Sequence, residues 1–256
     1  MAKKKTIADN RVFEKCTNEE NSLVKKLTDL HFNINIKCKS LKQKEFLTEL
    51  KKDEKKICFG IGSPGTGKSF ISLSYALKEI KSKNYKNIVM IIPTAQAGGD
   101  DFSIGYLKGD FYEKFKPFCD SDRETIEKIL KLSGNESYED IAKSLMENNI
   151  IKYECVNFLL GKTIEDSIIL VNESEQYTKS NLRLILTRIG DNSKIIITGD
   201  SKQVNRKTIV KGSDESGLLY AVSKLNEMEE VSVTEFTNED IVRNEIITKI
   251  LTVWDK

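Results

Sequence analysis

The most constraining feature of this 256-residue sequence is the glycine-rich stretch Gly62–Ser69, which reads G-S-P-G-T-G-K-S. The apolar run Ile57–Ile61 directly precedes it, and Phe70–Ile80 follows with apolar residues at helical spacing. A short apolar run predicts a buried parallel strand, and the spacing after the loop predicts an amphipathic helix. A strand, a glycine-rich loop and a helix in this order are the context in which such a loop binds phosphate. The sequence therefore predicts an α/β fold.

The rest of the chain extends this alternation of strands and helices. Further apolar runs predict strands at 88–92, 168–171 and 194–198. Helical spacing predicts helices at 41–50, 124–148 and 181–189, the second of them broken near 133–135. Ser40 is a candidate N-cap for the first of these helices. Alternating elements predict a doubly wound parallel sheet with helices on both faces.

Residues 1–40 differ from the remainder because they are polar and mixed, with one weak helical pattern. We therefore expect an appended N-terminal segment, 1–40, and a phosphate-binding domain, 41–256. Residues 1–56 hold 15 Lys and Arg against 9 Asp and Glu, a net +6, whereas the rest carries −4. This basic N-terminal stretch could contact nucleic acid phosphates, and a solvated lysine-rich surface is the alternative. Only six of the 41 basic residues are arginine, so base-specific recognition is poorly provided for.

Composition restricts the available chemistry. His31 is the only histidine, and the five cysteines are scattered without a C-x-x-C pair. A histidine metal site, a structural zinc and a disulfide framework are therefore disfavoured, and a reducing cytoplasm fits best. No apolar run approaches the ~18 residues of a membrane span, and no signal peptide follows Met1, so we expect no membrane partner.

Each residue type in the glycine-rich loop has a chemical role. The glycines let backbone N–H groups point inward at phosphate oxygens, and the following helix adds its positive end. Lys68 is expected to place its ammonium against the β- and γ-phosphates, and the Ser69 hydroxyl to bind Mg²⁺. We expect contacts to Mg-ATP from Gly62, Ser63, Pro64, Gly65, Thr66, Gly67, Lys68, Ser69 and Phe70.

Two later strands end in polar residues. The run 168–171 leads into Asn172 and Glu173, where phosphate-loop enzymes place a carboxylate that holds the metal's water shell and orients the attacking water. Glu173 is the candidate base, and Asn172 with Glu173 are candidate metal ligands beside Ser69. The run 194–198 leads into Gly199–Gln203, where a polar side chain could sense the γ-phosphate. The alternative for both is a strand that simply ends in a polar turn.

Several blocks together resemble the PhoH-like protein family. They are Phe59–Ser69, Tyr106–Asp110, Leu186–Gly190, Thr198–Val204, Ser216–Leu218 and Phe236–Arg243. They follow the family's order and cover roughly residues 40–253. The family, many of whose members are encoded by bacteriophages, resembles the first RecA-like motor domain of superfamily 1 helicases, and its proteins are ATPases proposed to act on RNA.

The resemblance implies roles for individual residues. Gln43 would recognise the adenine edge, Lys68 and Ser69 the phosphates and Mg²⁺, Glu173 the water, and Gln203 the γ-phosphate, with Arg243 as the arginine finger. Arg188 and Arg206 lie in or beside the blocks and would face phosphate, a neighbouring subunit, or only a surface ion pair. The resemblance also implies a P-loop NTPase of RecA-like fold, RNA or single-stranded nucleic acid as partner, and a homo-oligomeric ring, a hexamer being favoured. Its location would be the cytoplasm, that of the host if a phage encodes it.

The chain departs from the family pattern at points that matter for hydrolysis. Asn172 stands where the family has aspartate, Glu175 where it usually has glutamine, and Pro93–Ala95 replaces Arg-Pro-Ala. Two functions follow: an Mg²⁺-dependent ATPase, or a nucleotide-gated binding or scaffold protein that turns ATP over slowly because Asn172 is neutral. A small-molecule kinase would share the loop, but a lid with clustered arginines is not recognisable.

Overall fold

A computed structural model describes residues 31–92, 111–202, 216–242 and 253 of the chain. Its strands are β1 (Ile57–Ile61), β2 (Asn87–Ile92), β3 (Ile151–Cys155), β4 (Ser167–Val171), β5 (Lys194–Gly199) and β6 (Val231–Glu235). Its α-helices are α2 (Leu41–Leu50), α3 (Lys68–Lys81), α4 (Phe111–Leu132), α5 (Tyr138–Glu147), α6 (Lys179–Leu186) and α7 (Gly217–Leu225). The 3₁₀ turns are η2 (Val156–Phe158), η3 (Ser174–Gln176) and η4 (Asn238–Asp240).

The strands form one parallel sheet in the order β3-β2-β4-β5-β1-β6. The strand that precedes the glycine-rich loop therefore lies between two strands from the last third of the chain. Ile57 of β1 pairs with Ile195 on one side and with Val231 on the other. Because parallel sheets are covered on both faces, their central strands are buried along their whole length, as β4 and β5 are here. The predicted doubly wound α/β fold is confirmed.

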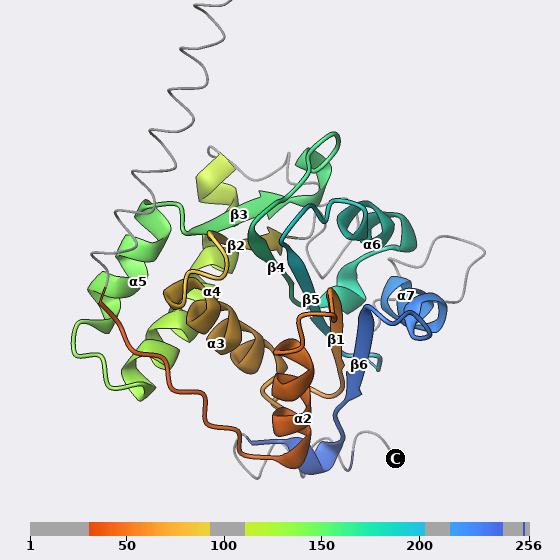
Figure 1. Cartoon of the computed structure of the whole chain (residues 1–256), viewed down its shortest axis with the longest axis horizontal. Coiled ribbons are helices and arrows are strands. Elements are labelled where there is room, and N and C mark those ends of the chain that lie inside the picture. The colour runs from red at the N-terminus through yellow and green to blue at the C-terminus, as the bar shows by residue number, and fades with distance from the viewer. Residues whose placement is uncertain (1–30, 93–110, 203–215, 243–252, 254–256) are drawn as a thin grey trace, which may run out of the picture.

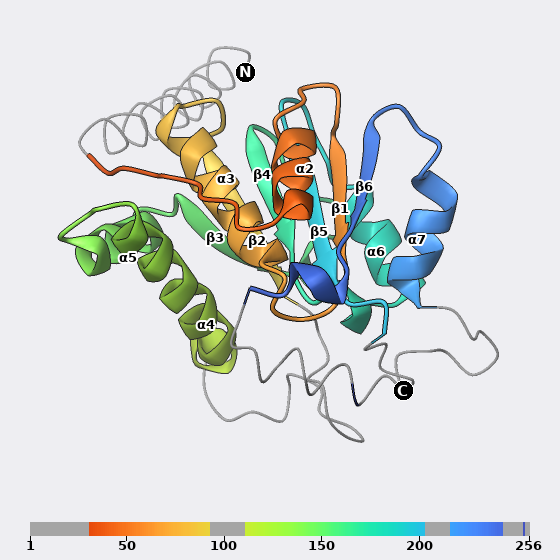
Figure 2. The same ribbon diagram turned by 90° about the horizontal axis from the view of Figure 1, so that it is seen from below.

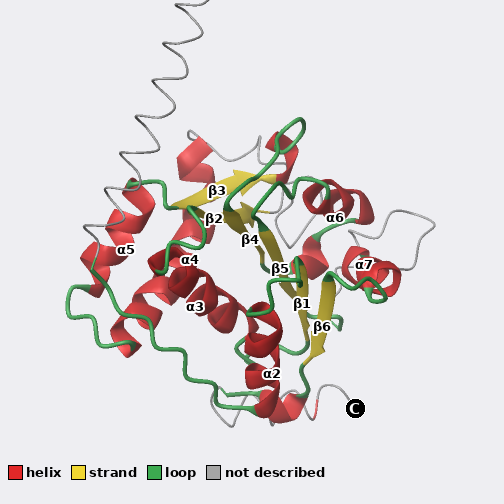
Figure 3. Cartoon of the chain, viewed as in Figure 1, coloured by secondary structure: helices red, strands yellow, loops and turns green. Residues whose placement is uncertain are grey.

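Helices cover both faces of the sheet (Figures 1 and 3). Helices α2, α3, α4 and α5 lie on one face, and successive strand residues alternate between the two sides. Cys58 of β1 points into the core beneath α2 and α3, whereas Phe59 points into the core beneath α6 and α7. None of the helices in the described ranges combines the length and apolarity that spanning a membrane requires.

Of the segment 1–40, the structure describes residues 31–40, and these run along the helical layer of α3, α4 and α5. Phe32 is 4% exposed and belongs to the core on that face. The N–H of Asn33 donates to Asn135 Oδ1 (2.7 Å), and the N–H of Asn35 donates to Ser133 Oγ (2.9 Å). These hydrogen bonds fix the stretch against the turn between α4 and α5.

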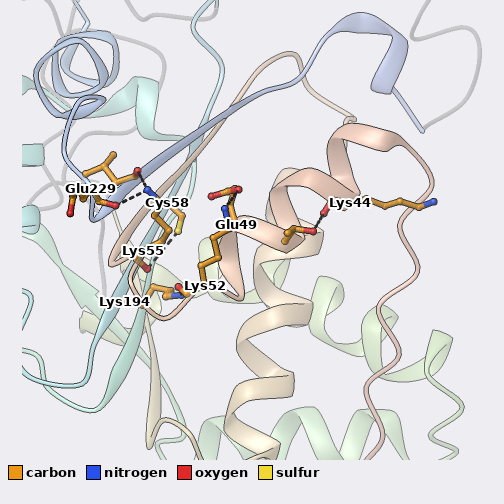
Figure 4. A network of polar contacts seen from close by, with 9 residues as sticks. Lys44, Glu49, Lys52, Lys55, Cys58, Lys194 and Glu229 are labelled. Atoms are coloured by element: carbon orange, nitrogen blue, oxygen red, sulfur yellow. Dashed lines mark hydrogen bonds and ion pairs between the residues drawn. The ribbon is translucent and has the colours of Figure 1, made fainter.

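Helix α2 is anchored at both ends. At its start, Ser40 is the N-cap as predicted, and its hydroxyl accepts from the N–H of Gln43 (3.2 Å). At its end, the fully buried Lys194 donates from Nζ to the carbonyl of Leu50 and to that of Lys52, which Figure 4 labels beside it. Burial lowers the pKa of Lys194, and the helix carbonyls compensate for part of that cost. A few residues away, Lys55 Nζ donates to the Glu229 carbonyl (2.6 Å), which ties the segment before β1 to the segment before β6.

Candidate nucleotide site

The glycine-rich loop lies at the carboxyl ends of β1 and β5. The chain leaves β1 toward α3 on one face of the sheet, and the helix that follows β5, α7, lies on the other face (Figure 1). Adjacent strands whose connections diverge in this way open a crevice, which is where ligands bind in open α/β sheets. The N–H of Gly62 donates to the Gly199 carbonyl (3.1 Å), so the two strand ends are directly joined.

Three glycines of the loop, Gly62, Gly65 and Gly67, have positive φ. Gly62 has φ 147°, and a Cβ there would lie 2.4 Å from the Phe236 carbonyl oxygen. Gly67 has φ 86° and is the N-cap of α3, which no side chain caps. The first N–H groups of a helix have no intrahelical partner, so the start of α3 offers backbone donors beside the loop. A helix start behind a curled loop fits a bound phosphate group.

Lys68 lies within this loop. Its Nζ donates to the carbonyls of Gly62 (2.6 Å) and Ser63 (2.9 Å) and lies 3.3 Å from Thr66 Oγ1. The residue is only 9% exposed, so the charge is held where little water screens it. The loop thus supplies a buried cation beside backbone donors, which is the combination that a polyphosphate requires.

Other parts of the chain hold the loop from outside. Gln43 is 3% exposed, and its Nε2 donates to the Thr66 carbonyl (2.8 Å) while its Oε1 accepts from the N–H of Lys39 (2.7 Å). Both ends of the Gln43 amide therefore bond within the protein. The predicted adenine contact would require the side chain to make a further bond or to change partners.

A second support is the segment Phe236–Val242, which we call the C-terminal strap. Asn238 Oδ1 accepts from Ser63 Oγ (2.7 Å), and the N–H of Val242 donates to the Gly65 carbonyl (3.0 Å). The strap begins where the N–H of Phe236 donates to the Ile61 carbonyl (2.7 Å). This segment lies in one of the blocks that resemble the PhoH-like family, but no role was predicted for Asn238.

A chain of polar contacts beside the loop joins the ends of β4 and β5 to the start of α3. Thr198 Oγ1 donates to Asn172 Oδ1 (2.9 Å), and Ser69 Oγ lies 3.3 Å from Thr198 Oγ1. The predicted pair Ser69 and Asn172 is thus brought together, with Thr198 as an unpredicted link. The described residues contain no group of three His, Cys, Asp or Glu side chains suited to a metal. Mg²⁺ fits such a site if phosphates and water supply most of its oxygen ligands, as it commonly accepts.

Glu173 follows Asn172 in a left-handed conformation, φ 50°, which is uncommon for a residue with a side chain. Its carboxylate is hydrogen-bonded to Glu175, which is buried and accepts from the N–H of Asp200 (3.0 Å). Burial, and then the bond to Glu173, raise the pKa of Glu175 to about 8. A protonated Glu175 would donate to the Glu173 carboxylate and orient it.

A further carboxyl lies near Glu173 and was not predicted. Asp122 comes from α4, and its pKa is raised to about 7, mainly by burial and partly by the charge of Glu173. No local sequence pattern could have predicted that Asp122 lies near Glu173, since Asp122 is on an amphipathic helix about fifty residues earlier in the chain.

Some predicted residues fall elsewhere. Gln203, Arg206 and Arg243 lie outside the described residues, as do the blocks 93–95 and 106–110. Arg188 lies beyond the end of α6, where its carbonyl accepts from the N–H of Ile164 and its Nη1 donates to the Lys162 carbonyl (3.2 Å). This is the edge where β4 and β5 begin, opposite the loop, so Arg188 does not face the phosphates of its own site.

Comparison with known proteins places these features in context. A family model described as PhoH-like protein matches residues 35–255. The chain is 31% identical over 221 residues to a PhoH-like protein of Bacillus subtilis (strain 168), covering 86% of this chain and 64% of that protein. It is 28% identical over 219 residues to one of Mycobacterium tuberculosis (strain ATCC 25618 / H37Rv), covering 86% and 58%. It is 28% identical over 201 residues to Protein PhoH of Escherichia coli (strain K12), covering 78% and 53%. The chain thus spans between 53% and 64% of the length of these curated relatives.

Proposed function

We propose, from the premise that this chain belongs to the PhoH-like protein family, that it is an Mg²⁺-dependent ATP-binding protein and ATPase. On this proposal its nucleotide state controls the binding of RNA or single-stranded nucleic acid in the cytoplasm. The observation that carries the proposal is the buried Lys68 ammonium inside a glycine-rich loop, at the start of α3, which no side chain caps.

The residues around the loop have distinct proposed roles. Backbone N–H groups of the loop and Lys68 would hold the phosphates, and Ser69 with Asn172 would contribute to binding Mg²⁺. Glu173, oriented by Glu175, would position and deprotonate the attacking water. Catalysis would be largely electrostatic, since phosphoryl transfer needs mainly positioning and charge stabilisation from the protein.

The test is Lys68→Ala, with Lys78→Ala as a matched control because Lys78 is an exposed lysine on the same helix. Calorimetric titration with Mg-ATP should show lost binding in Lys68→Ala and unchanged binding in Lys78→Ala. Turnover should disappear in the first variant alone, while both unfold at the wild-type temperature. Wild-type affinity for ATP in Lys68→Ala would refute the assignment.

A second candidate function rests on Asn172. Its amide is neutral and already accepts a hydrogen bond from Thr198, so it attracts Mg²⁺ less than a carboxylate does. The chain would then hold ATP with little turnover and act as a nucleotide-gated scaffold. Single-turnover hydrolysis separates the two functions. Asn172→Asp should raise turnover about tenfold if the metal site is limiting, which corresponds to ~1.4 kcal/mol of barrier.

The proposal also includes a head-to-tail ring, favoured as a hexamer by the family resemblance. Support comes from Val242, which is hydrogen-bonded to Gly65 of the loop and directly precedes Arg243 in the chain. Arg243 would act as an arginine finger at the interface between subunits, or else fold back onto its own site. Arg243→Ala should bind ATP and lose turnover by orders of magnitude. Activity recovered on mixing it with Lys68→Ala protein would support a shared site, whereas fully active monomers in sedimentation would end the ring hypothesis.

A further inference from the structure

Two lysines lie close to the ring of one tyrosine on the face of the sheet opposite α2 and α3. Lys179 is the first residue of α6, and its Nζ lies 4.2 Å from the ring centroid of Tyr220 in the first turn of α7. Lys224, one turn further along α7, has its Nζ 5.7 Å from the same centroid. Tyr220 remains 37% exposed and Leu219 beside it 39%. The two helices pack side by side, on the side of β6 away from α2 (Figure 2).

The charge on these two helices has one sign. Neither the α6 sequence, KSNLRLIL, nor the α7 sequence, GLLYAVSKL, contains an acidic residue. Besides Lys179 and Lys224 they carry the exposed Arg183. In the chain, Asp214 and Glu215 directly precede Ser216, and the next acidic residue is Glu227, beyond the end of α7. The two ammonium groups lie within about 10 Å of each other, close to one Debye length, so an anion at Tyr220 feels both.

We propose that Lys179, Tyr220, Lys224 and Arg183 form a binding site for single-stranded nucleic acid, with Tyr220 stacking on a base and the cations contacting phosphates. Proteins that bind single strands without sequence preference combine these two elements, a basic surface and an exposed aromatic ring. The partner is a single strand because a base paired in a duplex presents its edges, not its face, to a protein. The low arginine content of the chain agrees with binding that does not depend on sequence.

A few close contacts connect this site to the proposed nucleotide site. The inference that ATP controls strand binding through them rests on the proposed function. A Cβ on Gly217 would lie 2.4 Å from the Tyr177 carbonyl oxygen and 2.9 Å from the Lys179 nitrogen, so the start of α7 packs tightly on the start of α6. Tyr177 directly follows η3, which contains Glu175. Movement at Glu173 and Glu175 would therefore be transmitted to Lys179 and Tyr220 through a few close backbone contacts.

The experiment measures fluorescence anisotropy of a labelled 20-nucleotide oligouridine and of its deoxy counterpart with the full chain, in the absence of ATP. Tyr220→Ala should weaken binding about tenfold or more at an unchanged salt slope, and Tyr220→Phe should bind as wild type does, because a phenyl ring also stacks. Lys179→Gln and Lys224→Gln should each weaken binding and reduce the slope of log K against log salt by about 0.7.

A matched control is available on the other face, where Lys131 Nζ lies 5.2 Å from the ring of Tyr138 in a similar surface pair. Lys131→Gln removes the same charge and should leave binding unchanged. Equal losses in Lys131→Gln and Lys179→Gln would overturn the proposal, because they would indicate unspecific attraction. So would wild-type binding by Tyr220→Ala, or variants that alter sedimentation but not oligonucleotide binding, which would make the surface a subunit contact.

ATP binding is measured separately by calorimetry on the same proteins. If no oligonucleotide binds to the wild type while ATP does, the inference fails and the nucleotide assignment stands. If oligonucleotide binds through Tyr220 while ATP does not bind, the nucleotide assignment fails and the strand site stands.

Discussion

Replacing Gln43 by alanine removes two hydrogen bonds that hold the glycine-rich loop from outside. One is the bond from Nε2 to the Thr66 carbonyl, and the other is the bond from the Lys39 N–H to Oε1. Each such bond contributes about 0.5–1.5 kcal/mol net, so the free energy of unfolding should fall by roughly 1–3 kcal/mol. Thr66 is fully buried, and an unpartnered Thr66 carbonyl sets the upper part of that range.

Two roles for Gln43 then predict different nucleotide responses. If Gln43 braces the loop, Gln43→Ala weakens ATP, GTP and pyrophosphate by the same factor, because all three depend on the loop conformation. If Gln43 recognises the adenine edge, only ATP binding weakens. The bonded state of the amide favours the bracing role, so we expect an equal loss of about tenfold, equivalent to ~1.4 kcal/mol.

The assay pairs urea unfolding without nucleotide with calorimetric titration of the three ligands. Lys44→Ala is the control, because Lys44 is exposed on the same helix one residue further on, and it should change neither measurement. An ATP-specific loss with unchanged stability would refute the bracing role and restore the adenine contact as the explanation.

Three further predictions concern packing, pH and the buried lysine. In Gly199→Ala the new Cβ would lie 2.3 Å from Ser174 Oγ, so we expect the free energy of unfolding in urea to fall by about 1–3 kcal/mol. The control is Gly134→Ala, whose Cβ would have nothing within 4 Å; because Gly134 has φ 86°, its unfolding free energy should fall by only about 1 kcal/mol. Equal losses in the two variants would contradict the packing argument. The folded-state pKa of Asp122 is raised to about 7, so the folded protein binds more protons than the unfolded chain between about pH 4 and 7. Stability should therefore fall as pH rises through this window, and Asp122→Asn should flatten the dependence of the melting temperature on pH. An unchanged pH profile in that variant would assign the pH dependence to other groups. Lys194→Met leaves the carbonyls of Leu50 and Lys52 without their donor and should lower the free energy of unfolding by about 1–3 kcal/mol. Wild-type stability in this variant would contradict the prediction.

The sequence predicted the central strands well because burial on both faces requires long apolar runs. The run Ile57–Ile61 is β1 residue for residue, and the run 194–198 is β5 apart from its last glycine. Edge strands carry no such signal. In β3, Ile151–Cys155, the three middle residues are half-exposed, and β6 ends on an exposed glutamate, so neither strand was predicted.

Contacts at the site were harder to predict than its elements. The loop, Ser69 and Asn172 follow from local patterns, and the structure brings Ser69 and Asn172 to either side of Thr198. The bond between Asn238 and Ser63 joins residues that are far apart in sequence and that neither periodicity nor spacing relates. Such a contact depends on which strands become neighbours in the sheet, and single-sequence patterns do not specify that order.

The position of β1 in the sheet has a consequence for biosynthesis. Because Ile57 pairs with Ile195 and Val231, a nascent chain leaving the ribosome carries its glycine-rich loop long before either neighbouring strand has been made. Until then the apolar β1 has no ladder partner, and unpaired strand edges are prone to aggregate. Translation that stops before Val231 would therefore release a chain with the loop on an open edge of the sheet. We expect chaperones and proteases to recognise such a chain before it can bind a nucleotide.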